Sequence, residues 1–381
     1  MEPGSNVRWA IAGRSQERLS KIRQSLCEQY QLNEDDIPIL IASLDDAEAL
    51  RGVVSQAQVV IAMAGPYALM GTPVVEAAME TGTHYVDITG EAPWVAKIIE
   101  TYHERAEAKG LRIIPCCGYD SVPSDLGAMF VAEHVRQALG KGLASLRMVV
   151  TDFHGSVSGG TIASAMEMQR PGEHVARIDM QDVYALTPTK GPDRDFWGVE
   201  WVAPIKRYVT GFLMQVINNR IVHRSDYFLG YGSSFRYSET VPSPYWLGAQ
   251  AMRAGFLAGF FLMSQTWLHG ALKRVLPASG EGPSRKAMLE GHFQHTLIAK
   301  TEGPEPETVM AKVGWRHGDA GYWGASRMVL ESALAIALEG DKLEKDDKIQ
   351  KGGVLTPASG LGDTLLQRLK AAGFYFNIVD A

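Results

Sequence analysis

The sequence predicts an α/β protein in which a parallel sheet is followed by a second domain of different character. Short apolar runs alternate with stretches of helical periodicity over about the first 140 residues. Turn residues follow each apolar run, and the spacing leaves room for a helix between most successive runs. Strands that alternate with helices of this length indicate βαβ units, which build parallel sheets.

The first part of the chain contains the predicted strands and helices of this sheet. Each strand is an apolar run bounded by turn residues. Each helix begins where a serine or threonine can cap it, or where a proline can occupy its first position. The strands are Val7–Ala12, Ile37–Ala42, Val59–Ala64, His84–Ile88 and Leu111–Pro115, and helices begin at Ser15, Thr72-Pro73, Pro93 and Pro123.

A second α+β domain with a mixed sheet is predicted after about residue 140, where glycine and proline become frequent. Leu146–Phe153 and Thr296–Val313 have the composition of strands, and Trp323–Leu338 has that of a strong helix. The tail contains a helix around Leu365 and a short last strand. The predicted domains are residues 1–140, joined by residues 322–381, and residues 141–321.

Composition excludes several classes of protein. The formal net charge is -6 and no basic block stands out, which argues against nucleic-acid binding. The three cysteines include the adjacent Cys116 and Cys117, a poor disulfide framework that indicates a reducing compartment. No spacing of cysteines or histidines suggests a metal site. The start of the chain lacks the features of a secretory signal, and no apolar run reaches the ~18 residues of a membrane span. We therefore expect an intracellular, cytoplasmic protein.

Ligands of parallel sheets bind at the carboxyl ends of the strands, so the segments that follow the strands are candidate site residues. Gly13, Arg14 and Ser15 follow the first predicted strand. An arginine at this place accommodates the 2′-phosphate of NADP, whereas an acidic residue would favour NAD. The position predicts NADP(H) in preference to NAD(H), and an arginine that only caps or faces solvent is the alternative.

A glycine–proline turn follows the third predicted strand. Gly65 and Pro66 would let the chain approach a planar ligand closely, because glycine tolerates unusual backbone conformations. Tyr67 would then stack on the nicotinamide or donate a hydrogen bond to it or to the substrate. A plain turn with a packed tyrosine is the alternative.

Polar side chains at two further strand ends are candidates for chemistry. Asp120 and Ser121 stand at a helix entry, where they would lie near the substrate or cap the helix. The negative charge of Glu91 would stabilise the N-terminus of the helix that follows it in the sequence. Reduction needs a proton donor, and the sequence leaves Tyr67, His84 and Asp120 unranked for that role. The predicted catalytic residues are Tyr67, Asp120 and Ser121.

Five stretches carry a resemblance to a known family: WAIAGRSQERLSKI from Trp9, AGPYALMGTPVVEAAMETGTHYVDITGEAPWV from Ala64, GLRIIPCCGYDSVPSDLG from Gly110, SGGT from Ser158 and GGVLTPASGLGDTLLQRLKAAG from Gly352. Together they resemble the saccharopine dehydrogenase-like oxidoreductases. The resemblance implies a Rossmann-like doubly wound fold, NADP(H)-dependent oxidoreductase activity and a lipid-like or hydrophobic substrate. The family includes mycobacterial trans-acting enoyl reductases and is related more distantly to saccharopine reductases of lysine metabolism.

Three departures from the family pattern concern the cofactor. Family members open with a strand and a loop such as GATGFTG, whereas Met1–Asn6 stands at that place here. Ser43 and Ala62 replace an acidic residue and an asparagine of the family. The resemblance thus implies that the first βα unit is missing, which would leave two strands at twice the usual ~4.8 Å separation. We expect the chain as written to aggregate, not to bind NADP(H) measurably, and to be an incomplete version of a longer protein.

An apolar segment in the second domain, taken with the resemblance, implies contact with a membrane or lipid droplet. Residues 254–263 are too few to span a bilayer but suit its interface, through Phe256, Phe260 and Phe261. A buried core helix is the alternative. Two other functions stay open, a non-catalytic lipid-associated binding protein with a degraded nucleotide fold and a saccharopine reductase. A homodimer is also left open.

Overall fold

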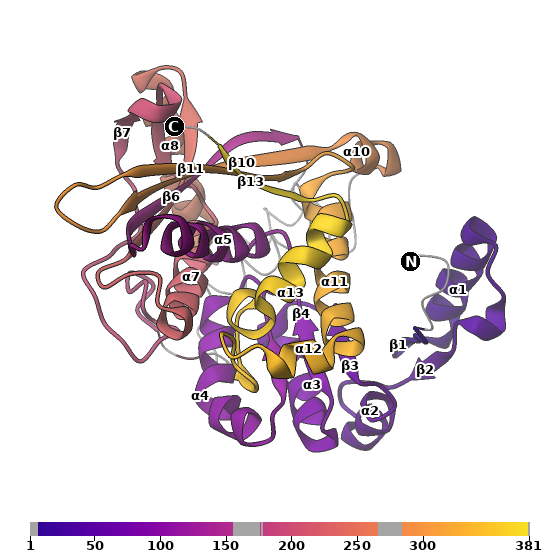
Figure 1. Cartoon of the computed structure of the whole chain (residues 1–381). Coiled ribbons are helices and arrows are strands. Elements are labelled where there is room, and N and C mark those ends of the chain that lie inside the picture. Colours follow the sequence, from indigo (N-terminus) through magenta and orange to yellow (C-terminus); the bar gives the residue numbers. More distant parts are fainter. Residues whose placement is uncertain (1–6, 155–175, 177, 266–283, 380–381) are drawn as a thin grey trace.

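The computed structural model describes residues 7–154, 176, 178–265 and 284–379. These residues form a four-stranded sheet, a seven-stranded sheet and a separate two-stranded sheet. Figure 1 shows the seven-stranded sheet across the top of the molecule and the four-stranded sheet below it, with helices between the two.

The four-stranded sheet is parallel and has helices on both faces. In sheet order its strands are β12 (Gly353–Val354), β5 (Arg112–Ile114), β4 (His84–Asp87) and β3 (Val59–Ala62), and the helices are α3 (Tyr67–Thr81), α4 (Ala92–Ala108), α5 (Val122–Leu139), α11 (Ala325–Leu338) and α13 (Pro357–Ala371). Tyr85 and Ile113 pack with α3 and α4, whereas Val86 and Ile114 pack with α5, α11 and α13. Both faces are buried, as parallel sheets require, so the predicted fold class is confirmed.

The first two strands form a sheet of their own. This unit consists of β1 (Ile11–Gly13), α1 (Gln16–Tyr30) and β2 (Ile39–Ile41), and β1 pairs in parallel with β2. Figure 1 shows it standing at the right of the molecule, apart from the four-stranded sheet. Among the described residues no strand joins β1 to β3, and the two do not pair directly. Leu19 is the one residue of α1 that is buried, so this unit shares little core with the rest.

The seven-stranded sheet is mixed, as predicted. All neighbours are antiparallel except β6 and β9, which run in parallel. The prediction of one strand over Thr296–Val313 is wrong, because the chain turns back near Gly303 to form a hairpin. In sheet order the strands are β13 (Tyr375–Val379), β11 (Thr308–Trp315), β10 (His292–Thr301), β6 (Leu143–His154), β9 (Arg236–Ser243), β8 (Arg207–Gly211) and β7 (Val199–Val202).

The C-terminal stretch returns to both large sheets. β12 pairs with β5 of the parallel sheet, and β13 pairs with β11 of the mixed sheet. Helix α13 lies between these strands in the sequence and packs on α5. The tail therefore contributes to both sheets, and the predicted domain boundaries stay a division made from the sequence.

Helix α5 lies between the two large sheets and joins their cores. It contacts β6, β10, β11 and β13 on one side and α13 on another. A Cβ added at Gly127 would stand 2.9 Å from Leu297 Cδ2, so glycine at this position favours the close approach of α5 to β10. The remaining elements are η1 (Glu34–Asp36), α2 (Ala47–Val54), η2 (Ala203–Ile205), α7 (Gln215–Leu229), α8 (Trp246–Ser264), α10 (Arg285–Glu290), the π-helical turn η4 (Ala320–Gly324) and α12 (Gly340–Lys345).

Helix α3 begins at Tyr67, ahead of the predicted start at Thr72-Pro73. Glu91 is the cause, because its buried carboxylate accepts hydrogen bonds from the backbone nitrogens of Tyr67 and Ala68, both at 2.8 Å. These are N–H groups that a helix start leaves without partners inside the helix. Glu91 was expected to stabilise the N-terminus of α4, the helix that follows it in the sequence, but its carboxylate caps α3 instead.

We expect Glu91→Ala to lower the free energy of unfolding by about 1–3 kcal/mol, because two buried N–H groups lose a charged acceptor. Chemical denaturation followed by circular dichroism measures the change. Glu100→Ala is the control, since Glu100 lies on α4 in an exposed ion pair with Lys97 and should cost less than about 0.5 kcal/mol. Equal losses in the two variants would contradict this role of Glu91.

Candidate functional site

The predicted cofactor residues after β1 line a hollow. The hollow is open to solvent, has a volume of about 370 Å³ and is lined by Gly13, Arg14, Ser15, Arg18 and Leu19. Ser15 caps α1 and accepts a hydrogen bond from the Arg18 backbone nitrogen at 3.3 Å. The guanidinium groups of Arg14 and Arg18 form no ion pair or hydrogen bond with another described residue, so both are free to meet an anion.

These residues fit the phosphate-bearing ribose of NADP(H). Two unpaired guanidinium groups beside a helix N-terminus suit a phosphate, because guanidinium forks and helix N–H groups are both phosphate donors. The described residues contain no glycine-rich loop between a strand and a helix that would receive the pyrophosphate. The start of α3 cannot replace it, since Glu91 already occupies its first N–H groups. The fit therefore concerns the 2′-phosphate end of the cofactor.

The turn after β3 holds Tyr67 in the core and not toward a ligand. The side chain is 5 % exposed, its hydroxyl donates to the Ala62 carbonyl at 3.0 Å, and its ring lies 5.5 Å from that of Trp94. Because the side chain is buried and its hydroxyl is hydrogen-bonded to a backbone carbonyl, the geometry argues against the predicted catalytic and nicotinamide-stacking roles of Tyr67. Gly65 and Pro66 are half-buried at the carboxyl end of β3, where their contact with cofactor stays a prediction.

His84 lies at the wrong end of the sheet for a proton donor. It begins β4, opposite the carboxyl ends, and its Nδ1 accepts a hydrogen bond from the Arg112 backbone nitrogen at 3.0 Å. Asp87 ends the same strand and is fully buried. It accepts from Tyr85, from the Thr89 nitrogen and from the Cys116 nitrogen, at 2.8–2.9 Å. Asp87 thus ties the ends of β4 and β5 together.

Asp120 is the candidate donor that the structure leaves available. It is half-buried in the loop between β5 and α5, and no hydrogen bond joins its carboxylate to a described residue. Burial raises the pKa of Asp120 to about 6. A carboxyl group with this pKa is divided between its acid and base forms near neutral pH, as proton transfer requires.

Ser121 connects the loop to the second domain. It precedes α5 without capping it, and its hydroxyl donates to Asn218 Oδ1 on α7 at 2.9 Å. Asn218 donates in turn to Glu239 on β9 at 3.0 Å, and Tyr237 donates to the other oxygen of Glu239 at 2.8 Å. Burial raises the pKa of Glu239 to about 7. The sequence reasoning missed these three partners, because a polar residue inside a helix or strand gives no sign of burial.

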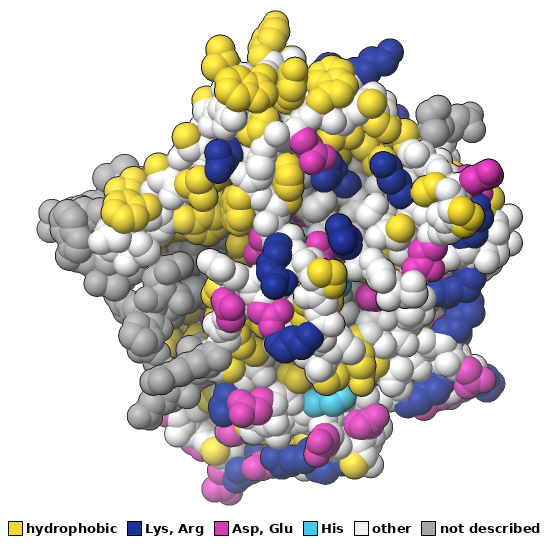
Figure 2. Space-filling model, turned by 90° about the vertical axis from the view of Figure 1, so that its left-hand side faces the viewer, with side chains coloured by type: hydrophobic (Ala, Val, Ile, Leu, Met, Phe, Trp, Pro, Cys, Tyr) yellow, Lys and Arg dark blue, Asp and Glu magenta, His cyan; other side chains and the backbone are white. Residues whose placement is uncertain are grey.

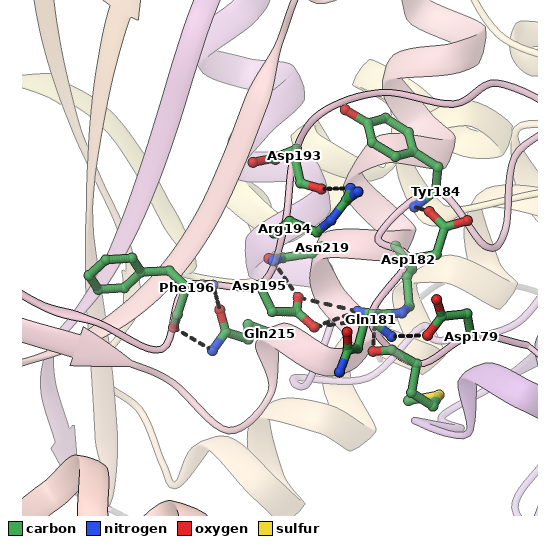
Figure 3. A network of polar contacts seen from close by, with 12 residues as sticks. Asp179, Gln181, Asp182, Tyr184, Asp193, Arg194, Asp195, Phe196, Gln215 and Asn219 are labelled. Carbon is green, nitrogen blue, oxygen red and sulfur yellow. Dashed lines mark hydrogen bonds and ion pairs between the residues drawn. The ribbon is translucent and has the colours of Figure 1, made fainter.

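A second polar network holds α7 in place. Figure 3 shows the segment 179–196 lying against α7, with Asp195 directed at Asn219 and Phe196 at Gln215. Asp195 also forms a buried ion pair with Arg220 at 3.2 Å. Gln215 bonds to both the nitrogen and the carbonyl oxygen of Phe196, at 2.8 and 2.9 Å. Since Asn218 lies on the same helix, this network fixes the position of the partner of Ser121.

Comparisons with known proteins identify the family of this chain. Residues 2–114 match the family described as the saccharopine dehydrogenase NADP binding domain. A Mycobacterium tuberculosis protein, whose name gives trans-acting enoyl reductase as an unproven assignment, is 36% identical over 394 residues, covering 97% of this chain and 90% of that protein. The trans-acting enoyl reductase of Mycobacterium leprae is 34% identical over 392 residues, with coverage of 97% and 90%.

The fold is also that of a solved structure. The saccharopine dehydrogenase (L-Glu forming) of Saccharomyces cerevisiae matches with a TM-score of 0.53 at 12% identity, and the match covers 99% of this chain and 95% of that one. At this identity the likeness supports the two-domain architecture and says nothing of substrate.

We expect Arg14→Ala to weaken binding of adenosine 2′,5′-bisphosphate about tenfold and to leave binding of 5′-AMP unchanged. A hydrogen bond to a charged group contributes ~1.5–3 kcal/mol, and ~1.4 kcal/mol corresponds to a tenfold change in Kd. Isothermal titration calorimetry measures both. Arg23→Ala is the matched control, since Arg23 lies on α1 in an ion pair with Glu34 and outside the hollow. Similar losses for both nucleotides would remove Arg14 from the 2′-phosphate site.

Proposed function

This chain belongs to the saccharopine dehydrogenase-like family of NADP-binding oxidoreductases, and we propose that it reduces the enoyl group of a lipid-like substrate with NADPH. The observation that carries the proposal is the half-buried carboxyl group of Asp120, which stands without a hydrogen-bond partner among the described residues at the carboxyl end of the parallel sheet. The names of the mycobacterial relatives support the enoyl chemistry. The two free arginines beside Gly13 support the choice of NADPH.

The proposed chemistry divides between cofactor and protein. NADPH, when bound, would supply a hydride to the carbon β to the carbonyl, and the α carbon would then need a proton. The protonated Asp120 carboxyl gives that proton from its O–H and becomes a carboxylate, which takes a proton back from water. Ser121 holds the loop through Asn218, so the carboxyl group keeps its place during the reaction.

We expect Asp120→Asn to lower kcat by about 10²–10⁴, the usual contribution of a positioned general acid. Because the chain as written is expected not to bind NADP(H) measurably, the assay uses a version extended at its N-terminus by a family-like strand, glycine loop and helix. A dodecenoyl thioester of N-acetylcysteamine serves as substrate, and loss of NADPH absorbance measures the rate. Only the protonated carboxyl donates, so the rate of the parent protein should fall as the pH rises above about 6, while the residual rate of the variant should not follow that curve.

The matched control for this experiment is Asp363→Asn, a carboxyl group on the exposed side of α13. Its rate and pH profile should equal those of the parent. An Asp120→Asn variant with the parent's rate would reject Asp120 as the proton donor. A parent protein that binds NADPH without reducing the thioester would favour the non-catalytic binding protein.

We further propose that α8 contacts a lipid surface. Ala249 is the one residue of this helix that is fully buried, and Arg253 carries its one charge. Leu247 and Phe261 are 73 % and 66 % exposed, and Ala254 lies between them on the same outward face. Figure 2 shows hydrophobic side chains gathered at the top of the molecule, where Figure 1 places α8 and β7. A surface helix normally turns polar residues outward, so an apolar outer face supports an interfacial role.

The predicted lipid-contacting phenylalanines differ in exposure. Phe261 points outward, whereas Phe256 and Phe260 are half-buried and Phe260 packs 5.5 Å from the ring of Trp197. Leu257 is 42 % exposed and belongs with Phe261 on the outer face. None of the described helices has both the length and the apolar character needed to cross a bilayer. The proposed contact is therefore peripheral.

We expect the double variant Leu257→Ser/Phe261→Ser to lose most of its binding to phosphatidylcholine vesicles in a flotation assay while melting as the parent does. Burying apolar side chains in lipid is the driving force, and both are exposed in the protein. Ile22→Ser/Leu338→Ser is the matched control, because these side chains are 49 % and 50 % exposed on other helices. Undiminished flotation of the α8 variant, or equal loss in the control, would refute the contact.

A further inference from the structure

A hydrogen-bonded pair of rings lies beside Asp120 where the two domains meet. Tyr119 precedes Asp120 in the loop after β5, and His295 lies on β10 of the mixed sheet. The Tyr119 hydroxyl and His295 Nε2 are 3.1 Å apart, and the rings stack with their centres 5.7 Å apart. The pair therefore connects the loop that carries the candidate acid to the sheet of the second domain.

Packing alone does not explain why a histidine occupies position 295. Its side chain is 2 % exposed, and its Nδ1 has no hydrogen-bond partner among the described residues. A buried nitrogen without a partner costs about 1–3 kcal/mol, which an apolar residue at this position would avoid. The pairing of β10 with β6 is also irregular here, because Gln294 lies opposite Asp152 while His295 lies opposite Val150. The extra residue is Thr151 of β6, and bulges of this kind are frequent beside active sites.

The surroundings of the pair suit an uncharged, apolar ligand. The Tyr119 ring lies 4.8 Å from that of Phe293 and 6.0 Å from that of Phe153, which is 43 % exposed. Burial lowers the pKa of His295 to about 3, so its ring is neutral at physiological pH. A neutral imidazole has one N–H donor and one acceptor, so the hydrogen bond to Tyr119 can run in either direction.

We propose that Tyr119 is a further catalytic residue, whose hydroxyl donates a hydrogen bond to the carbonyl oxygen of the enoyl group, and that His295 is the positioning residue that holds this hydroxyl. The inference rests on the proposed enoyl reduction. Addition of hydride at the β carbon moves an electron pair onto the carbonyl oxygen, and the enolate collapses when the α carbon takes the proton of Asp120. A donor placed in advance at that oxygen stabilises the charge as it develops.

Tyr119 and His295 can stabilise the charge on the carbonyl oxygen without transferring a proton between them. With the Nε2–H tautomer, His295 donates to the Tyr119 oxygen, and the Tyr119 O–H is left free to donate to the substrate. Each hydrogen bond in such a chain polarises the next, so the buried imidazole strengthens the phenol as a donor. Tyr119 then donates a hydrogen bond to the carbonyl oxygen, while its neighbour Asp120 gives a proton to the α carbon. Two adjacent residues of one loop thereby complete the reduction.

The test uses the carbonyl stretching frequency of a bound ligand. A saturated dodecanoyl thioester of N-acetylcysteamine, labelled with ¹³C at the carbonyl, cannot be reduced and needs no cofactor. We expect its carbonyl band to shift to lower frequency on binding to the parent protein. Tyr119→Phe and His295→Leu should abolish most of the shift, and His295→Gln, which keeps an N–H donor, should retain part of it.

Activity provides the second measurement. With the dodecenoyl thioester, Tyr119→Phe should lower kcat about 10²-fold and change KM much less, as for loss of one donor to a developing oxyanion. Tyr231→Phe is the control, because Tyr231 is 2 % exposed and lies two residues beyond the end of α7, outside the site. Thermal melting of each variant separates loss of the donor from loss of the fold.

The outcomes separate this inference from the proposed function. A parent protein that does not bind the saturated thioester would overturn the proposed substrate class. A bound thioester whose carbonyl band is the same in the parent and in Tyr119→Phe would overturn the role of Tyr119 and leave enoyl reduction by Asp120 intact. A Tyr119→Phe variant that melts as the parent does and keeps the parent's kcat would likewise overturn the role of Tyr119.

Discussion

The packing of α5 between the two sheets is the constraint on which the rest of the site depends. Its N-terminus carries Asp120 and Ser121, so their positions follow from where the helix lies. Gly127 allows its close approach to β10. On its other side, the buried carboxylate of Asp125 accepts from the Ala358 nitrogen of α13 at 2.7 Å and from the Ser225 hydroxyl of α7. One helix thereby sets the distance between the loop after β5 and the mixed sheet.

This packing buries carboxyl groups in the core, so the stability of the fold depends on whether they are protonated. Burial raises the pKa of Asp87 and Asp125 to about 7, well above the ~3.9 of an unfolded aspartate. The folded state therefore binds these protons more tightly than the unfolded state. The stability that they contribute is present in full below about pH 4 and is lost as the pH rises through about 7. Asp87 and Asp125 share a raised pKa with Asp120, so a raised pKa alone does not single out a proton donor. The proposal for Asp120 rests on the absence of a hydrogen-bond partner among the described residues.

The sequence predicted what depends on local pattern. The strands of the parallel sheet are apolar runs between turn residues, and Asp120 and Ser121 were candidates because they follow such a strand. The start of α3 was misplaced because Glu91, which caps it, lies 24 residues away along the chain. The partners on α7 were missed for a related reason. Asn218 looks like part of a solvated helix face, but it is buried and bonded to Ser121 and to Glu239 of β9, contacts that local periodicity does not report.

The charges around Asp120 bear on the choice between an enoyl group and a dicarboxylate amino acid. Burial alone accounts for the shifted pKa of Asp120 and of His295, and no described lysine or arginine contributes to either. The buried Arg220 is already paired with Asp195, and Arg224 donates to backbone carbonyls. Neither Arg220 nor Arg224 is free to receive a substrate carboxylate, so a substrate with several carboxylates would bring unpaired negative charge against Asp120 and Glu239, at a cost that burial increases. A neutral enoyl chain meets no such penalty, and the aromatic rings around Tyr119 match its apolar surface. These contacts support the proposed enoyl substrate over a dicarboxylate amino acid.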